Sequence, residues 1–346
     1  MTGNRRTFLQ GMGAALFSSA AGELLADTAP DWKKQIGLEL FTVRDLLQKD
    51  FEGTIAHVAE IGYKEVEPAT GYNNLEPKQF RAMLDRYGLT MPSTHSGATD
   101  GPDLEKQLEG FQIMGLKYTE VRGGGGRGGG GRGQGAGAVA PPPGAPAAAP
   151  PPDGAGRGRG PGMGRGPGGG PPPPRNAQSV ESVKRSAEQL NKYGAVVKKF
   201  GMKMLIHNHT GEFELLDDGR QTQYDVLLAE TDPELVAMQL DIGWASVAGK
   251  NILEMFARNP GRYELWHVKD AIDIRNVDPR MSPSERQRIA KLVPVGLGEV
   301  DYRSIFAAAK VAGLKHFCIE QDSAAQWGDS MAASRVSFQN LVRALS

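Results

Sequence analysis

Residues 180–209 read VESVKRSAEQLNKYGAVVKKFGMKMLIHNH, and this stretch holds one complete unit of the pattern that decides the fold. Its first part has apolar residues at three- and four-residue spacing, which predicts an amphipathic helix that stops at Gly201. The apolar run that follows predicts a strand ending at His207 and His209. Because residues two apart on a strand point to the same side, both imidazoles would face one compartment.

The same helix-then-strand unit recurs along the chain. Apolar runs that predict strands lie at residues 36–43, 65–69, 89–95, 117–123, 203–209, 236–244, 263–270 and 316–322. Helix-like periodicity lies between most of them, at residues 51–62, 76–88, 180–201 and 301–313. Eight strands alternating with helices over roughly 260 ordered residues predict a (β/α)8 barrel. A doubly wound open sheet is the alternative, but it needs a glycine-rich nucleotide fingerprint directly after a strand, and we find none.

The amino terminus has the layout of an export signal. Arg5 and Arg6 precede Phe8 and Leu9, and a short Gly/Ala-rich apolar stretch follows that is too short to span a bilayer comfortably. The paired arginines resemble a twin-arginine signal, so we expect residues 1–29 to direct export, to the periplasm. We expect no membrane association once this signal has been removed.

A second change of composition covers residues 123–175, which are almost entirely Gly, Pro, Ala and Arg. With so few apolar side chains larger than Ala, this segment cannot bury enough surface to offset the entropy of ordering, so we expect it to be disordered. It follows the fourth predicted strand and interrupts a single barrel formed by residues 30–122 and 176–346. Its six arginines against one acid, Asp153, suggest a nucleic-acid role, but it lacks aromatic side chains for stacking. We prefer a tolerated insertion.

The composition of the whole chain narrows the class of partner. The chain has 346 residues, and 40 Lys and Arg balance 40 Asp and Glu, so no overall field attracts it to nucleic acid or an acidic membrane. The single cysteine, Cys318, excludes an intrachain disulfide and lies in an apolar run, where we expect a buried packing residue. The sequence leaves the oligomeric state open, including a homo-oligomer.

Each predicted strand ends in polar groups that are unusual for a strand. They are Glu39, Glu67, His95, Glu120 with Arg122, His207 with His209, Asp241, His267 with Lys269, and Glu320 with Asp322. In a barrel the carboxyl ends of all strands meet at one face, where the loops build the active site. Exposure to solvent at the rim of a barrel would explain a polar group at any one strand end, but not polar groups at all of the strand ends together. The sequence therefore predicts one shared site.

Several of these groups have the chemistry of metal ligands. Imidazole nitrogen combined with carboxylate oxygen suits Mn²⁺, Zn²⁺, Co²⁺ or Fe²⁺ better than Ca²⁺. Asp241, His267 and Glu320 are the strongest candidates, because an ionised carboxylate at the end of an apolar strand is costly unless it is paired or coordinated. A further ligand would come from the end of the preceding strand, where the candidates are His207, His209 and Glu212.

Seven short runs in a fixed order resemble a known family. They are IGLELFTVRD, IGYKEVE, HNHTGEFE, LDIGW, HVKD, VGLGEVDYRSIF and IEQD. Together they resemble the sugar phosphate isomerase/epimerase family, whose members have a xylose isomerase-like TIM barrel. The resemblance covers about residues 34–122 and 176–346 and does not specify a substrate.

The resemblance implies a divalent metal held by Glu, Asp, His and Glu from the fifth to eighth strands. Asp241, His267 and Glu320 match the last three of these positions. At the first position relatives often have a glutamate that also serves as an acid/base group in epimerases, whereas this chain has His207. Either His207 is a ligand and the second acid/base group lies elsewhere, or Glu212 reaches back to supply the carboxylate.

The implied chemistry begins with a metal that binds a sugar carbonyl and the adjacent hydroxyl and stabilises an enediolate. Return of the proton gives epimerisation or isomerisation, and loss of a β-substituent gives elimination. We expect Glu320 as the base, His209 or Glu212 as the second acid/base group, and Lys269 as a partner of the developing oxyanion. The residues expected to bind the rest of the substrate are Glu39, Glu67, His95 and Trp244.

We therefore predict an exported, metal-dependent sugar isomerase or epimerase that acts on a small keto-sugar. A keto-sugar lyase or hydratase using the same site is the first alternative. A carbohydrate-binding barrel without catalytic activity is the second. An endonuclease-like relative acting on DNA shares the barrel, but the neutral charge and the export signal argue against it.

Overall fold

The computed structural model describes residues 30–123 and 177–346. The predicted export signal, and the predicted insertion apart from Gly123, lie outside the described residues. Within the described part of the chain, every helix is too short or too polar to cross a membrane.

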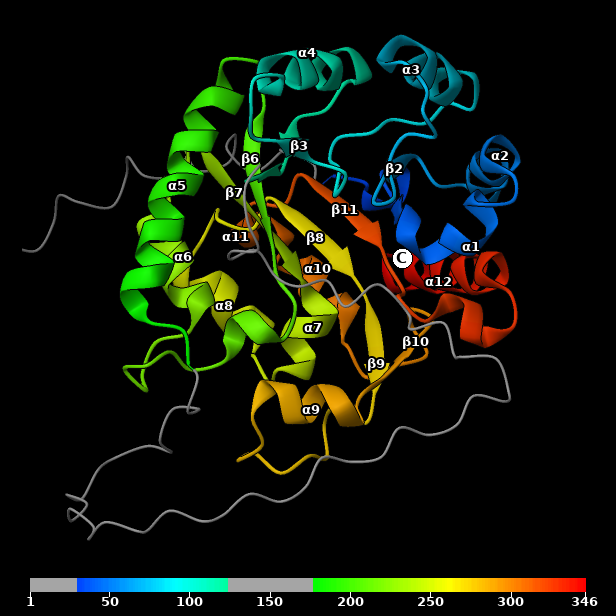
Figure 1. The fold of residues 1–346 in the computed structure, drawn as a ribbon. Helices are drawn as coiled ribbons and strands as arrows, with labels where there is room; N and C mark the ends of the chain where they lie inside the picture. Colours follow the sequence, from blue (N-terminus) through cyan, green and yellow to red (C-terminus); the bar gives the residue numbers. More distant parts are fainter. Residues whose placement is uncertain (1–29, 124–176) are drawn as a thin grey trace, which may run out of the picture.

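Seven parallel strands form the central sheet, in the order β2-β1-β11-β8-β7-β6-β4 (Figure 1). They are β1 (Gly37–Glu39), β2 (Glu65–Glu67), β4 (Tyr118–Thr119), β6 (Lys203–His207), β7 (Val236–Asp241), β8 (Leu265–Val268) and β11 (His316–Ile319). The first and last of these strands along the chain are neighbours, since Gly37 of β1 pairs with Cys318 of β11. The sheet therefore curls round and brings the two ends of the barrel sequence together, as a (β/α)8 fold requires.

The predicted strand at residues 89–95 is extended but is not a regular strand. The Val66 N–H donates to the Thr90 carbonyl at 2.9 Å, and the Tyr118 N–H donates to the Pro92 carbonyl at 3.0 Å. The segment therefore lies between β2 and β4, where the third strand of the barrel belongs. Pro92 has no N–H to donate, so a regular hydrogen-bonded ladder cannot continue through it. A short parallel pair, β3 (Ala98–Thr99) with β5 (Val121–Arg122), follows just outside this segment.

Helices cover the outside of the sheet (Figure 1). They include α1 (Arg44–Leu47), α2 (Phe51–Ile61), α3 (Pro77–Arg86), α4 (Leu104–Met114), α5 (Val180–Lys198), α6 (Gln223–Glu230), α7 (Ile242–Val247), α8 (Ile252–Arg258) and α12 (Ser330–Ala344). The helix predicted at residues 301–313 is split into α10 (Tyr302–Ala307) and α11 (Ala309–Ala312). The four glycines predicted to stop helices, Gly62, Gly88, Gly201 and Gly313, all have positive φ, a conformation that a side chain disfavours.

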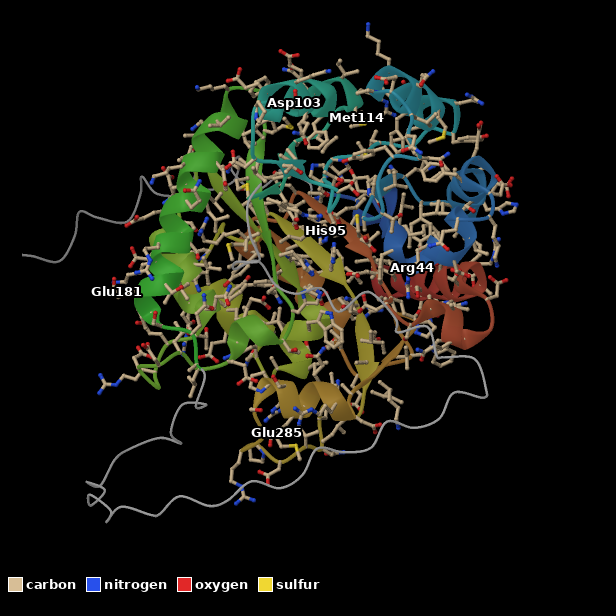
Figure 2. All side chains as sticks on the ribbon, viewed as in Figure 1. Arg44, His95, Asp103, Met114, Glu181 and Glu285 are labelled. Carbon is tan, nitrogen blue, oxygen red and sulfur yellow. The ribbon has the colours of Figure 1, made fainter. Side chains whose placement is uncertain are left out.

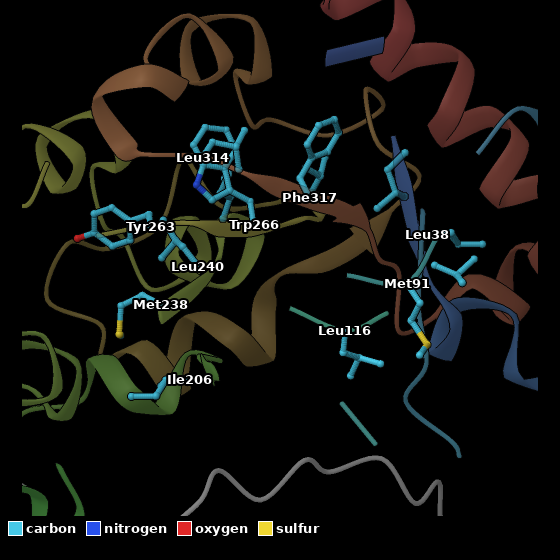
Figure 3. Close-up of a cluster of buried hydrophobic side chains, with 14 of the residues drawn as sticks. Leu38, Met91, Leu116, Ile206, Met238, Leu240, Tyr263, Trp266, Leu314 and Phe317 are labelled. Atoms are coloured by element: carbon cyan, nitrogen blue, oxygen red, sulfur yellow. The ribbon is translucent and has the colours of Figure 1, made fainter. Parts of the chain in front are cut away.

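The main hydrophobic core lies between the strands and this outer layer of helices (Figure 3). Trp266 of β8 is its largest fully buried side chain, and it stacks on Phe256 of α8 with 5.0 Å between ring centroids. Because side chains alternate along a strand, the neighbours of Trp266 in the sequence point to the inside of the barrel. There a separate apolar cluster of Tyr118, Leu205, Ala237 and Leu265 forms a floor beneath the polar strand ends.

The chain makes an excursion after β8 before it returns to the outer layer. The strands β9 (Asp270–Ile272) and β10 (Lys291–Val293) form an antiparallel pair, and α9 (Pro283–Ile289) lies between them in the sequence. The Asp270 carboxylate accepts hydrogen bonds from the N–H groups of Gly296 at 2.9 Å and Gly298 at 3.1 Å. A Cβ added to Gly298 would lie 2.1 Å from Asp270 Oδ1, so this close approach requires glycine.

Candidate metal centre

Four side chains from four neighbouring strands meet inside the barrel at the carboxyl ends of those strands. They are His207 at the end of β6, Asp241 at the end of β7, His267 in β8 and Glu320 directly after β11. One possible ligand atom from each lies within 4.8 Å of the other three. All four side chains are more than nine-tenths buried. Asp241, His267 and Glu320 are the three strongest candidates of the sequence analysis, and His207 is one of its three candidates for the remaining ligand.

Each of these side chains carries a buried polar atom that makes no hydrogen bond of good geometry to the described residues. The atoms are His207 Nδ1, Asp241 Oδ2, His267 Nδ1 and Glu320 Oε2. Three of these atoms instead form close ion pairs, since His267 Nδ1 lies 2.6 Å from Glu320 Oε2, and Lys269 Nζ lies 3.0 Å from both Asp241 Oδ2 and Glu320 Oε2. Two imidazoles and two carboxylates form a donor set that suits a first-row divalent metal. The residues present therefore fit the metal that the family resemblance implies.

The local structure explains how Asp241 keeps one oxygen for this cluster. Its Oδ1 accepts a hydrogen bond from the Trp244 N–H at 2.8 Å and so caps the first turn of α7, which leaves its Oδ2 to face the other charged groups of the cluster. Asn208, between the two histidines, accepts a hydrogen bond from the Asp241 N–H at 3.1 Å. This bond ties the end of β6 to the end of β7 and so sets His207 beside Asp241.

Lys269 places a buried cation against the same carboxylates. Its Nζ lies 3.0 Å from Asp241 Oδ2, 3.0 Å from Glu320 Oε2 and 2.9 Å from Asp322 Oδ2. Burial alone would lower the pKa of Lys269, but Asp241, Asp322 and Glu320 raise it well above its ordinary value. The ammonium is therefore a permanent charge of the site.

The second nitrogen of His267 meets a carboxylate on the other side of the ring. His267 Nε2 lies 2.7 Å from Glu67 Oε2. Gln239 Nε2 donates to both oxygens of Glu67 at 2.9 Å, and Gln239 Oε1 lies 2.6 Å from His95 Nε2. Burial by itself would raise the pKa of Glu67, but His95, His267 and Gln239 lower it to about 2. Glu67 is therefore ionised and fully engaged.

The pKa shifts of His207 and Glu320 favour the forms that bind a metal, whereas that of His267 favours the protonated ring. Burial, together with the neighbouring His267, lowers the pKa of His207 well below its ordinary value, which favours the neutral imidazole that binds metals. Burial would raise the pKa of Glu320, but Lys269 and His267 lower it well below its usual range. Burial opposes the charge of His267, whereas Glu320 and Glu67 on its two sides raise its pKa.

The structure separates His207 from the two alternatives for the remaining ligand. The His209 ring lies 4.9 Å from the His207 ring and 6.4 Å from the Trp244 ring, outside the group of four. Burial and the nearby charge of Lys269 lower the pKa of His209 to about 4. Glu212, in the short helix η3 (Gly211–Phe213), accepts a hydrogen bond from the His209 N–H at 2.7 Å. The Glu212 carboxylate thus stabilises the conformation of the loop to which it belongs.

The residues expected to bind the rest of the substrate differ in how much surface they offer. His95 keeps 18% of its side chain exposed and is labelled near the middle of the view in Figure 2. Glu39 is buried and accepts a hydrogen bond from the Phe41 N–H at 2.9 Å, and burial with the charge of Glu320 raises its pKa. Trp244 is buried against Val247 and Ala271, which leaves little of its ring for a sugar. Glu67 offers no surface at all.

Sequence reasoning missed two contributors to the site. Gln239 stands in the middle of a strand and looked like a core position, although its spacing of two from Asp241 places it on the same face. The excursion after β8 brings α9 over the loop that follows β6. There Gln287 hydrogen-bonds Thr210, and the Ser284 N–H donates to Glu214 at 2.8 Å.

A cavity of about 440 Å³ lies next to this contact. It is lined by Ala177, Gln178, Gly211, Glu214, Leu215, Leu216, Gln223, Ser282 and Ser284. None of these is a predicted site residue, so the cavity lies beside the loop that follows β6 and does not contain the metal centre.

Comparison with protein families identifies the barrel. The family model described as xylose isomerase-like TIM barrel matches residues 161–336, just over half of the chain. The chain belongs to this family. The resemblance inferred from the seven sequence runs is thereby confirmed at the level of the family, and the predicted fold is confirmed with it.

Known relatives of this family member include two inosose dehydratases. The protein from Geobacillus thermodenitrificans is 29% identical over 143 residues, which cover 39% of this chain and 46% of the relative. The protein from Bacillus licheniformis is 31% identical over 132 residues, which cover 36% and 42%. The chain thus spans less than half the length of the curated relatives that it matches.

Solved structures share the fold over most of their length. A sugar phosphate isomerase/epimerase from Parabacteroides distasonis has a TM-score of 0.57 at 17% identity and covers 93% of this chain and 97% of its own. A xylose isomerase-like TIM barrel protein from Mycobacterium smegmatis, solved in complex with magnesium, has a TM-score of 0.53 at 13% identity and covers 91% and 97%. Identities this low show the shared fold alone.

Proposed function

We propose that this chain is a metal-dependent enzyme that removes the proton beside the carbonyl of a polyhydroxy ketone. The outcome that we favour is loss of water from the neighbouring carbon, as in a dehydratase. Isomerisation or epimerisation of a keto-sugar is the second candidate. The observation that carries the proposal is the buried group of two imidazoles and two carboxylates, whose possible ligand atoms lie within 4.8 Å of one another, beside the buried ammonium of Lys269.

His207, Asp241, His267 and Glu320 are the residues that would hold the metal. A bound divalent ion would act as a Lewis acid on the ketone oxygen, which makes the proton on the adjacent carbon easier to remove. We leave the ion open among Mn²⁺, Zn²⁺, Co²⁺ and Fe²⁺, all of which suit mixed imidazole and carboxylate ligands.

Glu320 is the residue that we assign as the base. Its carboxylate is ionised, and its buried Oε2 lies 2.6 Å from His267 Nδ1. Lys269 Nζ, 3.0 Å away, supplies a fixed positive charge and N–H donors for the oxyanion that develops on the substrate. His209, close to both Lys269 and Trp244, is our choice for the group that exchanges a proton with the departing or returning oxygen.

The replacement of a family glutamate by His207 is the reason for favouring dehydration. Epimerisation needs a proton donor or acceptor on each face of the same carbon. Here the first ligand position holds an imidazole whose pKa is lowered by burial and by His267, and Glu320 is the carboxylate base that remains. Elimination on one face needs one base and one acid for the leaving hydroxyl. The inosose dehydratases among the sequence relatives support the same choice.

The substrate that we propose is an uncharged small molecule, either a keto-sugar or a cyclic polyhydroxy ketone. His95 would contact its distal hydroxyls, with Glu39 and the edge of Trp244 as further neighbours of the site. Glu67 is removed from this group, because both of its oxygens are already bonded. Export by the twin-arginine route remains part of the proposal, on the strength of the sequence alone.

Incubation with an inosose and a panel of ketoses in D₂O, with Mn²⁺, Co²⁺ or Zn²⁺ supplied, tests the proposal. A dehydratase will release one water per substrate, which mass spectrometry detects, and Glu320→Gln should slow this reaction by about 10²–10⁴-fold. Deuterium incorporation beside the carbonyl without loss of water would identify the isomerase or epimerase instead. A barrel that binds these sugars but neither exchanges a proton nor loses water would contradict catalysis and indicate a binding protein.

A further inference from the structure

We propose that Glu67 and Gln239 are positioning residues that turn His267 so that its Nδ1 faces the metal position, and that hold His95 beside it. The inference rests on the proposed metal-dependent function, because it assigns the residues that orient one of the ligands. Neither residue belongs to the group of four. Each acts through a hydrogen bond to a histidine.

The orientation of His267 follows from its two neighbours. Glu67 Oε2 lies 2.7 Å from Nε2, and both side chains are fully buried. On the opposite edge of the ring, Nδ1 lies 2.6 Å from Glu320 Oε2 and 4.0 Å from Asp241 Oδ2. An imidazole that donates one N–H to a carboxylate is fixed in tautomer and in ring angle, so the other nitrogen is presented to a metal.

Gln239 extends this arrangement to His95. Its Nε2 donates to both Glu67 oxygens at 2.9 Å, and a side-chain amide has only one donor end and one acceptor end. Its Oε1 is therefore the atom that faces His95 Nε2 at 2.6 Å, and that nitrogen must carry the proton. The Nδ1 of His95 is then the nitrogen with a free lone pair. The His95 ring stacks on the His267 ring with 5.0 Å between centroids and 22° between planes.

The location of Glu67 argues against a purely structural role. A fully buried carboxylate loses its hydration, and apolar residues of similar size are often at least as stabilising in such a position. Glu67 lies instead at the carboxyl end of β2, where it bonds a histidine of the metal group directly and another through Gln239. Glu67 bonds the Nε2 edge of His267 and not the Nδ1 edge, which faces the metal position.

The same strand offers a matched control. Glu65 is also buried, lies two residues earlier on β2 and also bonds a histidine, since its Oε1 is 2.9 Å from His316 Nδ1. That pair lies at the opposite end of the barrel, and neither residue belongs to the group that could hold a metal. Glu65→Gln therefore reproduces the change of charge and the loss of a Glu–His contact without touching the centre.

The experiment measures the affinity of the whole protein for Zn²⁺ and Co²⁺ by competition with a coloured chelator. We expect Glu67→Gln to weaken the binding of both ions by about 10–100-fold. Glu65→Gln should leave both affinities unchanged. Two-dimensional ¹H–¹⁵N spectra of the zinc-loaded wild type should show His267 bound to zinc through Nδ1 and protonated at Nε2. This second readout needs no variant, so it stands even if a substitution at Glu67 prevents folding.

The outcomes separate this inference from the function on which it rests. A wild type that retains no divalent ion contradicts the proposed function itself. A wild type that binds zinc through His267 Nε2 overturns the positioning role alone. Equal metal affinity in folded Glu67→Gln and in Glu65→Gln would do the same, because a merely structural carboxylate predicts that result.

Discussion

Lys269 Nζ lies 3.0 Å from Asp241 Oδ2, so a buried cation contacts an oxygen that could also bind the metal. An ammonium cannot be a metal ligand while it is protonated, and its charge repels a second cation nearby. Lys269 therefore contributes to the site in a way that is separable from metal binding.

This separation predicts the effect of Lys269→Met. The substitution removes the donor for the developing oxyanion, so turnover should fall by about 10²–10³-fold. Metal content, measured by plasma emission spectrometry on purified protein, should be retained, because a repulsive charge has been removed from the ligand oxygens. Lys203→Met is the control, since Lys203 is also paired, 2.6 Å from Glu264 Oε1, at the other end of the barrel. Loss of metal in Lys269→Met alone would show that the lysine supports the ligands.

Removal of each proposed ligand gives a second prediction. Asp241→Ala, His267→Ala, Glu320→Ala and His207→Ala should each abolish metal retention during gel filtration, because every one deletes a donor from a set of four. Circular dichroism should show that the barrel survives. Glu212→Ala is the contrasting variant, since its carboxylate bonds the His209 N–H, and it should keep the metal. If Glu212→Ala lost the metal and His207→Ala kept it, the remaining ligand would be Glu212 and not His207.

The imidazole at the first ligand position predicts a preference among metals. With two nitrogen donors, the wild type should prefer Zn²⁺ and Co²⁺ over Mn²⁺. His207→Glu exchanges one nitrogen for oxygen and should shift the ratio of affinities toward Mn²⁺, as measured by competition between the ions for the metal-free protein. His57→Glu, on the surface of α2, is the control for the added charge. An unchanged ratio in His207→Glu would mean that His207 does not touch the ion.

Much of the site could be predicted because strand polarity and alternation are local rules. Asp241, His267 and Glu320 each end an apolar run, and parallel strands bring such ends to one face. The partner of His267 could not be predicted in this way. Glu67 lies 200 residues away in the sequence, and only the closure of the barrel sets it against the imidazole.

Two errors of the sequence analysis have local causes. The strand predicted through Trp244 ends at Asp241, because that side chain caps α7 and turns the chain into a helix. This turn also buries Trp244 against Val247 and Ala271. The strand predicted at residues 89–95 is irregular because Pro92 cannot donate a hydrogen bond to its neighbour. In both cases one residue overrides an apolar pattern that was otherwise correct.

Asp270 gives the last prediction, which concerns stability. Its two oxygens accept four hydrogen bonds from backbone N–H groups, those of Ala271, Gly296, Gly298 and Val300. Asp270→Asn replaces one acceptor with an NH₂ group that faces donors, so at least one buried amide loses its partner. We expect the free energy of unfolding to fall by about 2–3 kcal/mol, as measured by urea denaturation.

Asp273→Asn is the matched control for Asp270→Asn, because it makes the same chemical change three residues later. Asp273 is partly exposed and paired with Lys291, and its positive φ is one that asparagine tolerates well. Its substitution should change the free energy of unfolding by less than about 1 kcal/mol. If both variants unfold at the same urea concentration as the wild type, the Asp270 carboxylate does not hold the loop between β10 and α10. The contacts of Gly296 and Gly298 would then have to be explained by the packing of that loop against α12.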